Sequence, residues 1–99
     1  AVALAGRGCT VDVTAFPVAD GEDAWPAAEA LVRYWAAGAS AARVTVSSDG
    51  GGCLPVFDRE LRVVAMDVGD AGTVAATLAE LVARGVALEQ ALPPFTSNV

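Results

Sequence analysis

The stretch VTVSSDGGGC, residues 44–53, is the part of the sequence that decides the fold. Its first residues alternate between β-branched and small polar side chains, which is the period-two pattern of a β-strand. Asp49 stands at the end of this pattern, and three glycines follow at once. A glycine run ends a strand and lets the backbone approach another group closely. The pattern therefore predicts a strand that ends in a carboxylate beside a glycine loop.

Two interpretations of Asp49 follow from this local pattern. Catalytic and ligand-binding groups of α/β proteins collect at the carboxyl ends of the strands, where a carboxylate can bind a metal or accept a proton. Because side chains alternate along a strand, we expect Thr45, Ser47 and Asp49 to share one face. The alternative is that Asp49 only forms a turn with the glycines. The pattern alone leaves both open.

A strand, a helix and the strand at residues 44–48 follow one another within about 40 residues, which is the spacing of a βαβ unit. The first strand covers residues 9–16 and ends before Pro17. The helix runs from about Ala24 to Ala37, with Asp23 as its N-terminal cap and Gly38 as its stop. We therefore expect two parallel strands joined by a right-handed crossover.

Asp12 lies within the first strand, with Val11 and Val13 expected on the opposite face. Apolar residues on one side and small polar residues on the other suit a barrel strand whose inner face approaches a site. Because Asp12 lies well below the end of the strand, we interpret it as a structural carboxylate that is hydrogen-bonded inside the fold.

The predicted helix carries one charged pair and three nearby aromatic residues. Glu29 and Arg33 have the i,i+4 spacing that favours an ion pair. Trp25, Tyr34 and Trp35 could form a stacking platform, but packing in the core or between helices is the better interpretation. The polar face of this helix is narrow, so we expect it to pack on more than one neighbour.

The second half of the chain is predicted to form a hairpin and a further helix. Residues 54–57 and 61–66 flank a short charged turn. A helix from about Ala71 to Arg84 follows, capped by Asp70 and closed by Gly85. Its periodicity predicts a solvent-facing stripe of Thr73, Thr77, Glu80 and Arg84, and an apolar stripe of Val74, Leu78, Leu81 and Val82.

The composition indicates a chain that is covered by something outside the sequence. Its 99 residues suffice for one domain at most. The sequence is 55% apolar without glycine, whereas soluble domains reach about 45–50% with glycine included. After a short helical turn at residues 86–92, residues 95–99 read as the beginning of a capped helix. We therefore expect the chain to be part of a longer protein.

Charge and residue content exclude several classes of function for these residues. The net charge is −6, all six cationic residues are arginines, and there is no histidine. An acidic chain without a basic patch predicts neither a nucleic-acid partner nor binding to anionic membranes. No apolar run approaches the roughly 20 residues of a membrane-spanning helix. Without histidine or lysine, these residues alone cannot form a Ser-His-Asp triad, a histidine metal site, a Schiff base or a P-loop.

Cys9 and Cys53 lack the spacing of a metal site, and we expect both to be free thiols of a reduced, cytoplasmic protein. The start of the sequence shows no signal-peptide pattern. Cys53 has no histidine here to activate it as a nucleophile. The glycine loop matches neither a dinucleotide fingerprint nor a P-loop.

Residues 44–50, the loop and hairpin through Asp58, and the closing residues 88–93 with 96–98 resemble the carboxyl-terminal part of a β-aspartyl (isoaspartyl) dipeptidase. These enzymes are metal-dependent members of the amidohydrolase superfamily. Residues 11–14 resemble the strand that precedes the aspartate strand in that family. The resemblance implies an α/β fold that is a partial (β/α)₈ TIM barrel: its last two strands with their helices, plus a β-hairpin insertion. Residues 1–99 would then be a carboxyl-terminal fragment of the catalytic domain.

The resemblance also implies a function. The full-length protein would be a zinc-dependent hydrolase of small β-aspartyl dipeptides and a homo-oligomer, whereas the isolated fragment would be inactive. Its binuclear zinc centre would be held by a His-x-His pair, a carboxylated lysine and two further histidines, all outside this sequence. Asp49 falls on the aspartate that binds metal and accepts the proton of the attacking water. Gly51, Gly52 and Cys53 fall on the substrate-binding loop, and Cys53 replaces the family's serine. The family's substrate-binding arginines also lie outside this sequence.

An alternative of a different class is a free-standing α/β binding or interaction domain without catalysis. The excess of apolar residues and the unfinished helix at the end of the sequence favour the dipeptidase interpretation.

Overall fold

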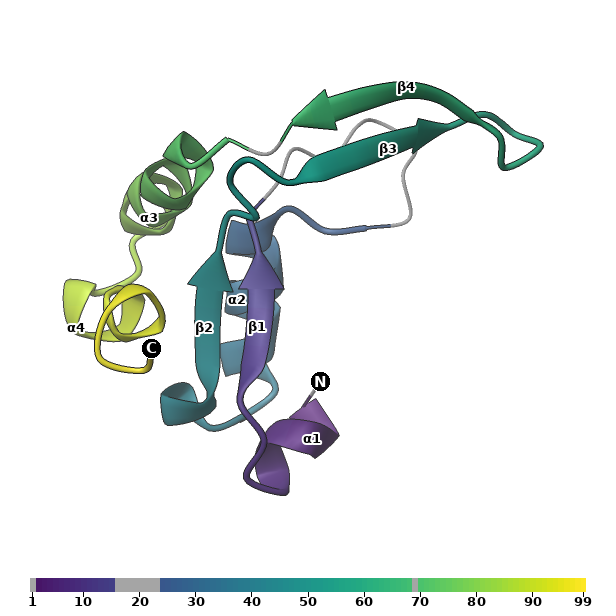
Figure 1. The fold of residues 1–99 in the computed structure, drawn as a ribbon. Helices are drawn as coiled ribbons and strands as arrows, with labels where there is room; N and C mark the ends of the chain where they lie inside the picture. The colour runs from purple at the N-terminus through teal and green to yellow at the C-terminus, as the bar shows by residue number, and fades with distance from the viewer. Residues whose placement is uncertain (1, 16–23, 69) are drawn as a thin grey trace.

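The structure, a computed structural model, describes residues 2–15, 24–68 and 70–99 (Figure 1). Short helices and strands follow one another along the whole described chain. They are α1 (Val2–Gly6), β1 (Val11–Thr14), α2 (Ala27–Ala36), η1 (Ala41–Arg43), β2 (Val44–Ser47), β3 (Cys53–Phe57), β4 (Val63–Val68), α3 (Gly72–Ala83), α4 (Leu88–Ala91) and η2 (Pro93–Phe95), where η marks a 3₁₀ helix.

Strands β1 and β2 lie side by side and parallel, as the βαβ pattern predicts. Their register runs from Val11 opposite Val44 to Thr14 opposite Ser47. Helix α2 lies against one face of this pair (Figure 1). Valines of both strands point toward that face because side chains alternate along a strand. The other face carries the polar side chains of the two strands.

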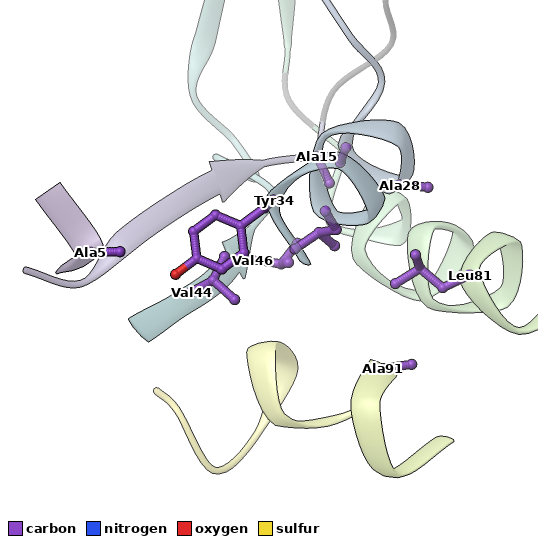
Figure 2. Close-up of a cluster of buried hydrophobic side chains, with 10 residues drawn as sticks. Ala5, Ala15, Ala28, Tyr34, Val44, Val46, Leu81 and Ala91 are labelled. Atoms are coloured by element: carbon purple, nitrogen blue, oxygen red, sulfur yellow. The ribbon is translucent and has the colours of Figure 1, made fainter. Parts of the chain in front are cut away.

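The core lies between the β1–β2 pair and the helices. Val44 of β2, Leu31 of α2 and Leu81 of α3 are completely buried. They belong to one apolar cluster, which also contains Ala91 of α4 (Figure 2). Each fully buried aliphatic side chain contributes on the order of 1.5–3 kcal/mol to stability. Among the described residues, this core joins α1, β1, α2, β2, α3 and α4 and includes no residue of the β3–β4 hairpin.

Helix α2 begins at Ala27, three residues later than predicted, and Pro26 occupies its N-cap position with an extended backbone. A residue that precedes proline is disfavoured in the helical conformation, so Trp25 stays outside the helix. The predicted cap, Asp23, lies outside the described residues. At the other end Gly38 has a φ of +76°, which confirms it as the stop. The helix packs on β1 and on α3, which confirms that it has more than one neighbour.

The three aromatic residues near α2 differ in their surroundings. Tyr34 is buried, its hydroxyl donates to the Ser40 carbonyl at 2.6 Å, and burial raises its pKa. Trp35 is half-buried against the core. The prediction of core packing is wrong for Trp25, which is 58% exposed and has the Arg33 guanidinium 4.4 Å above its ring. Because Trp25 precedes the helix, the helical periodicity does not direct it inward.

The predicted hairpin is confirmed as the antiparallel strands β3 and β4, which form a second sheet of their own. Cys53 pairs with Val68 at the base, and the register becomes irregular at Val56 and Phe57. The hairpin extends away from the β1–β2 pair (Figure 1). In the described part of the chain the strands form these two separate sheets, so no closed barrel is present.

The buried face of helix α3 agrees with the predicted one at Leu81, which is fully buried, and at Leu78, which packs against the core, but two residues differ. Thr77 is only 8% exposed, because its hydroxyl donates to the Thr73 carbonyl at 2.8 Å and is thereby satisfied without water. Val82, predicted on the apolar stripe, is instead exposed. Ala71, not the predicted Asp70, is the N-cap residue of α3. The Asp70 carboxylate nevertheless accepts the N–H of Gly72, the first residue of the helix, at 2.8 Å.

The closing residues return to the start of β2. The Asn98 amide donates to the carbonyls of Ala41 and Val44, at 2.7 and 2.9 Å. Residues 96–98 form a turn, so the predicted helix start at residues 95–99 is wrong, because Thr96 leaves the helical conformation with a ψ of −87°. Among the residues that the structure describes, no helix is long and apolar enough to cross a membrane.

Candidate functional site

The candidate site is the turn at the carboxyl end of β2. Gly52 N–H donates to the Asp49 carbonyl at 2.8 Å, which closes a four-residue turn. Gly51 has a φ of +81°, the value that the third position of a type II turn requires. This turn carries the chain from β2 directly into the β3–β4 hairpin (Figure 1).

Asp49 departs from the strand pattern that precedes it. The strand ends at Ser47, and Asp49 adopts a φ of +52°, in the left-handed region. Aspartate is one of the few residues other than glycine that enter this region readily. The expectation that Thr45, Ser47 and Asp49 share one face therefore fails at Asp49, because alternation requires extended backbone up to that residue.

The Asp49 carboxylate is exposed and lies directly against Gly52. A Cβ atom placed on Gly52 would be 2.8 Å from Cγ, Oδ1 and Oδ2 of Asp49. Within residues 2–15, 24–68 and 70–99, no hydrogen bond reaches this carboxylate. Its oxygens are thus available to accept a proton or to bind a cation.

Helix α3 begins next to this turn. A Cβ on Gly50 would lie 3.3 Å from Cβ of Ala71, the residue before the helix. The Thr73 hydroxyl lies 2.5 Å from the Ala15 carbonyl at the end of β1, and 2.7 Å from the Asp70 carbonyl. Sequence reasoning missed this link between α3 and the strand ends. A threonine three residues after a capping aspartate was the available signal, since it is a common backbone-binding position.

Asp12 is confirmed as a hydrogen-bonded carboxylate. Thr45 Oγ1 donates to its Oδ1 at 2.7 Å, and Ser47 Oγ donates to its Oδ2 at 2.5 Å. The expectation that it lies inside the fold is wrong for this chain, because Asp12 is exposed on the sheet face opposite α2. Both oxygens of Asp12 thus accept hydrogen bonds, whereas none from the described residues reaches the Asp49 carboxylate beyond the end of β2.

The predicted substrate-binding residues follow Asp49 in the same turn. Gly51 and Gly52 form its second half, and Cys53 is the first residue of β3 and is exposed. Cys9 is exposed as well, and both cysteines are free thiols, as predicted. That Gly51, Gly52 and Cys53 contact a substrate stays a prediction.

The Asp49 carboxylate could supply one ligand to a zinc ion, which needs further ligands. Zinc sites use three or four protein ligands, and carboxylate oxygen is among the accepted types. In the part of the chain that the structure describes, no group of three or more His, Cys, Asp and Glu residues could hold a metal ion. The donor chemistry of Asp49 therefore fits a zinc site whose other ligands come from outside these residues.

No family model matches the chain. Among solved structures, the fold is similar to the crystal structure of the β-aspartyl dipeptidase from the thermophilic, keratin-degrading Fervidobacterium islandicum AW-1, in complex with a β-Asp-Leu dipeptide. The TM-score is 0.81 and the sequence identity 32%, and the match covers 97% of this chain and 24% of that chain. This chain thus spans about a quarter of the length of that enzyme. Its mixed α/β fold resembles part of a β-aspartyl dipeptidase, and this likeness indicates a region related to a hydrolase.

Proposed function

We propose that this chain is the carboxyl-terminal part of a TIM-barrel catalytic domain, that of a zinc-dependent hydrolase of β-aspartyl dipeptides, and that Asp49 is its metal-binding general base. One observation carries the proposal: an exposed carboxylate, free of hydrogen bonds to the described residues, stands just beyond the end of β2 in a chain that matches a β-aspartyl dipeptidase over 97% of its length.

The fold supports this assignment. Two adjacent parallel strands backed by a helix are the repeating unit of a (β/α)₈ barrel, and barrel enzymes carry their catalytic groups at the carboxyl ends of the strands. In such a barrel the face opposite α2 would point inward, because helices cover the outside. That face carries Asp12, Thr45 and Ser47, so the rest of the barrel would cover the Asp12 network that is exposed in this chain.

The proposed chemistry of Asp49 is a proton transfer. One oxygen of its carboxylate accepts the proton of the attacking water, and the same group then donates it to the departing amine. Zinc, when bound, supplies a Lewis acid that polarises the scissile carbonyl. The position of Asp49 in a turn suits this role, because the carboxylate stands clear of the strand and no other side chain among the described residues binds it.

The substrate would lie along the glycine turn. Gly51 and Gly52 offer backbone groups without side chains in the way, which lets a dipeptide approach closely. Cys53 offers a thiol, which is a weak hydrogen-bond donor. In this proposal the full protein is cytoplasmic and a homo-oligomer that binds neither nucleic acid nor membranes, in keeping with its acidic charge and its exposed apolar hairpin.

A second candidate is a non-catalytic α/β interaction domain. The hairpin favours it, since both of its strands expose large apolar side chains. The two candidates differ in what they require of Asp49: catalysis needs its charge, whereas an interaction domain needs only its turn.

The test is Asp49→Asn in the full-length protein. This change keeps the shape of the side chain and removes the base, so kcat for a β-aspartyl dipeptide should fall by at least about 10²–10⁴, the usual contribution of general acid–base catalysis. Glu60→Gln, an equal loss of charge at the exposed tip of the hairpin, is the matched control and should leave kcat unchanged. Metal analysis of both variants shows whether zinc is still bound. A wild-type kcat in Asp49→Asn with zinc bound would refute the assignment and favour the turn-forming role.

A further inference from the structure

We propose that Gly52 is a positioning residue for Asp49: the absence of a side chain at Gly52 provides the space in which the Asp49 carboxylate lies. The placement of the carboxylate is a property of the turn itself, whereas its consequence for catalysis rests on the proposed function.

A side chain would be unfavourable at each of the three consecutive glycines, but for a different reason at each position. At Gly51 the requirement is conformational, because its φ of +81° disfavours any L-residue, while a Cβ there would meet no atom within 4 Å. At Gly50 it is a close approach, because a Cβ would lie 3.0 Å from Ser48 Oγ and 3.3 Å from the Ala71 Cβ. At Gly52 the backbone does not have a positive φ, so conformation does not demand glycine. There the three nearest atoms are those of the Asp49 carboxylate, all at 2.8 Å from the added Cβ.

A methyl group at Gly52 would displace the carboxylate rather than the backbone. Gly52 N–H is tied to the Asp49 carbonyl, and the next residue, Cys53, is paired with Val68 in the hairpin. The Asp49 side chain, in contrast, ends in a group without a hydrogen bond to any described residue. Rotation of this side chain is therefore the least costly way to relieve the clash.

The size of the displacement follows from atomic radii. Non-bonded carbon atoms prefer a separation of about 3.5–4.0 Å, so a contact of 2.8 Å must open by about 1 Å. A misplacement of about 1 Å in a catalytic group can lower a rate by roughly 10²-fold. Gly52→Ala should therefore leave folding intact and lower kcat about 100-fold through Asp49, and any rise in KM would report the separate effect of the methyl group on the approach of the dipeptide.

The direct measurement is a pair of crystal structures of the full-length protein, wild type and Gly52→Ala. We expect the Asp49 carboxylate to move by about 1 Å while the turn backbone stays in place. Thermal unfolding should give the same Tm for both proteins. Gly51→Ala is the matched control: its methyl group meets no atom but its backbone is strained, so it should lower the Tm. A carboxylate that stays in place in Gly52→Ala, or a marked loss of Tm in that variant, would overturn the proposal.

The kinetic measurement is a double-mutant cycle. If Gly52 acts only by placing the carboxylate, adding Gly52→Ala to Asp49→Asn should cost far less than the 100-fold seen in the wild-type background. Additive losses of kcat would show that Gly52 acts independently of Asp49 and would overturn the positioning role. This result is distinguishable from failure of the proposed function, in which Asp49→Asn itself keeps its kcat whatever the crystal structures show.

Discussion

The β1–β2 pair and the β3–β4 hairpin are both two-stranded sheets of one chain, yet they differ in how much of their apolar side chains is buried. Val44 of β2 is fully buried, whereas Val64 and Met66 of β4 are 60% and 57% exposed. The parallel pair is covered by α2 and by the closing turn, which docks on β2 through Asn98. The hairpin forms a separate sheet that extends away from them (Figure 1).

This difference shows that the two sheets are held by different forces. The parallel pair is stabilised by apolar burial, which is proportional to the area removed from water. An isolated two-stranded hairpin is only marginally stable in water. The hairpin therefore depends on local hydrogen bonds, above all at its tip, and its exposed apolar residues contribute little within this chain.

The largest expected effect comes from the core beneath the parallel pair. Leu31→Ala should lower the free energy of unfolding by about 2–5 kcal/mol, because it leaves a cavity at a fully buried position. Val64→Ala, the matched truncation in the hairpin, should change it by less than about 0.5 kcal/mol. Denaturant unfolding of both variants gives the two values. Equal losses would show that the hairpin is as well packed as the core, and would break the comparison.

Much of the fold could be predicted from the sequence because periodicity reports local backbone geometry. The alternation around Val46, the helix between the strands and the paired runs of the hairpin each belong to one short segment. The parallel orientation of the two strands then followed from the length of the connection. The sequence could not show that Thr77 of α3 is buried, because this burial depends on a hydrogen bond to the Thr73 carbonyl that removes the need of the hydroxyl for water.

The candidate site was predictable in position but not in geometry. A carboxylate before three glycines located the turn. However, the left-handed φ of Asp49 and its contact with Gly52 arise from how the turn closes, which no residue pattern encodes. The hydrogen bonds from Thr45 and Ser47 to Asp12 were implicit in the register of the two strands. They became visible only once that register was known.

An intermediate effect is expected at the hairpin tip. The Asp58 carboxylate accepts the backbone N–H groups of Glu60 and Arg62, both at 2.9 Å, and the Arg62 Nε at 3.0 Å. Asp58→Ala should cost about 1 kcal/mol, a typical net value for lost hydrogen bonds. We expect faster amide exchange throughout β3 and β4 and unchanged exchange in β1 and β2.

Glu60→Ala is the control for Asp58→Ala. Glu60 is exposed and reaches Arg62 only at 3.4 Å, and such surface pairs contribute little. Hairpin exchange should therefore stay as in the wild type. If Asp58→Ala speeds exchange in the parallel pair as well, the two sheets unfold together and their independence is disproved.

The smallest effect concerns the ion pairs that join α2 to α3. Arg84, the residue after α3, contacts Glu29 of α2 at 2.6 Å, and Arg33 contacts Glu29 at 2.9 Å. The hydrogen bond from Arg84, and then that from Arg33, lowers the pKa of the Glu29 carboxyl below its ordinary 4.5. The same contact with Glu29, and then that with Glu80, raises the pKa of Arg84.

The sign of the pH dependence follows from this lowered pKa. Because the folded state holds the Glu29 proton less tightly than the unfolded state, the ion pair stabilises the fold above pH 4.5, and this contribution is lost as the pH falls through the folded pKa. Glu29→Gln should therefore lower the Tm slightly at pH 7, and the gap to the wild type should close in acid. The side chains are partly solvent-exposed, so salt should weaken the effect as well. Since Glu29 joins two helices of the core, hairpin amide exchange should not respond to the substitution. A Tm gap that widens as the pH falls would contradict the assigned sign of the pH dependence. Faster amide exchange in β3 and β4 would show that the ion pair also stabilises the hairpin.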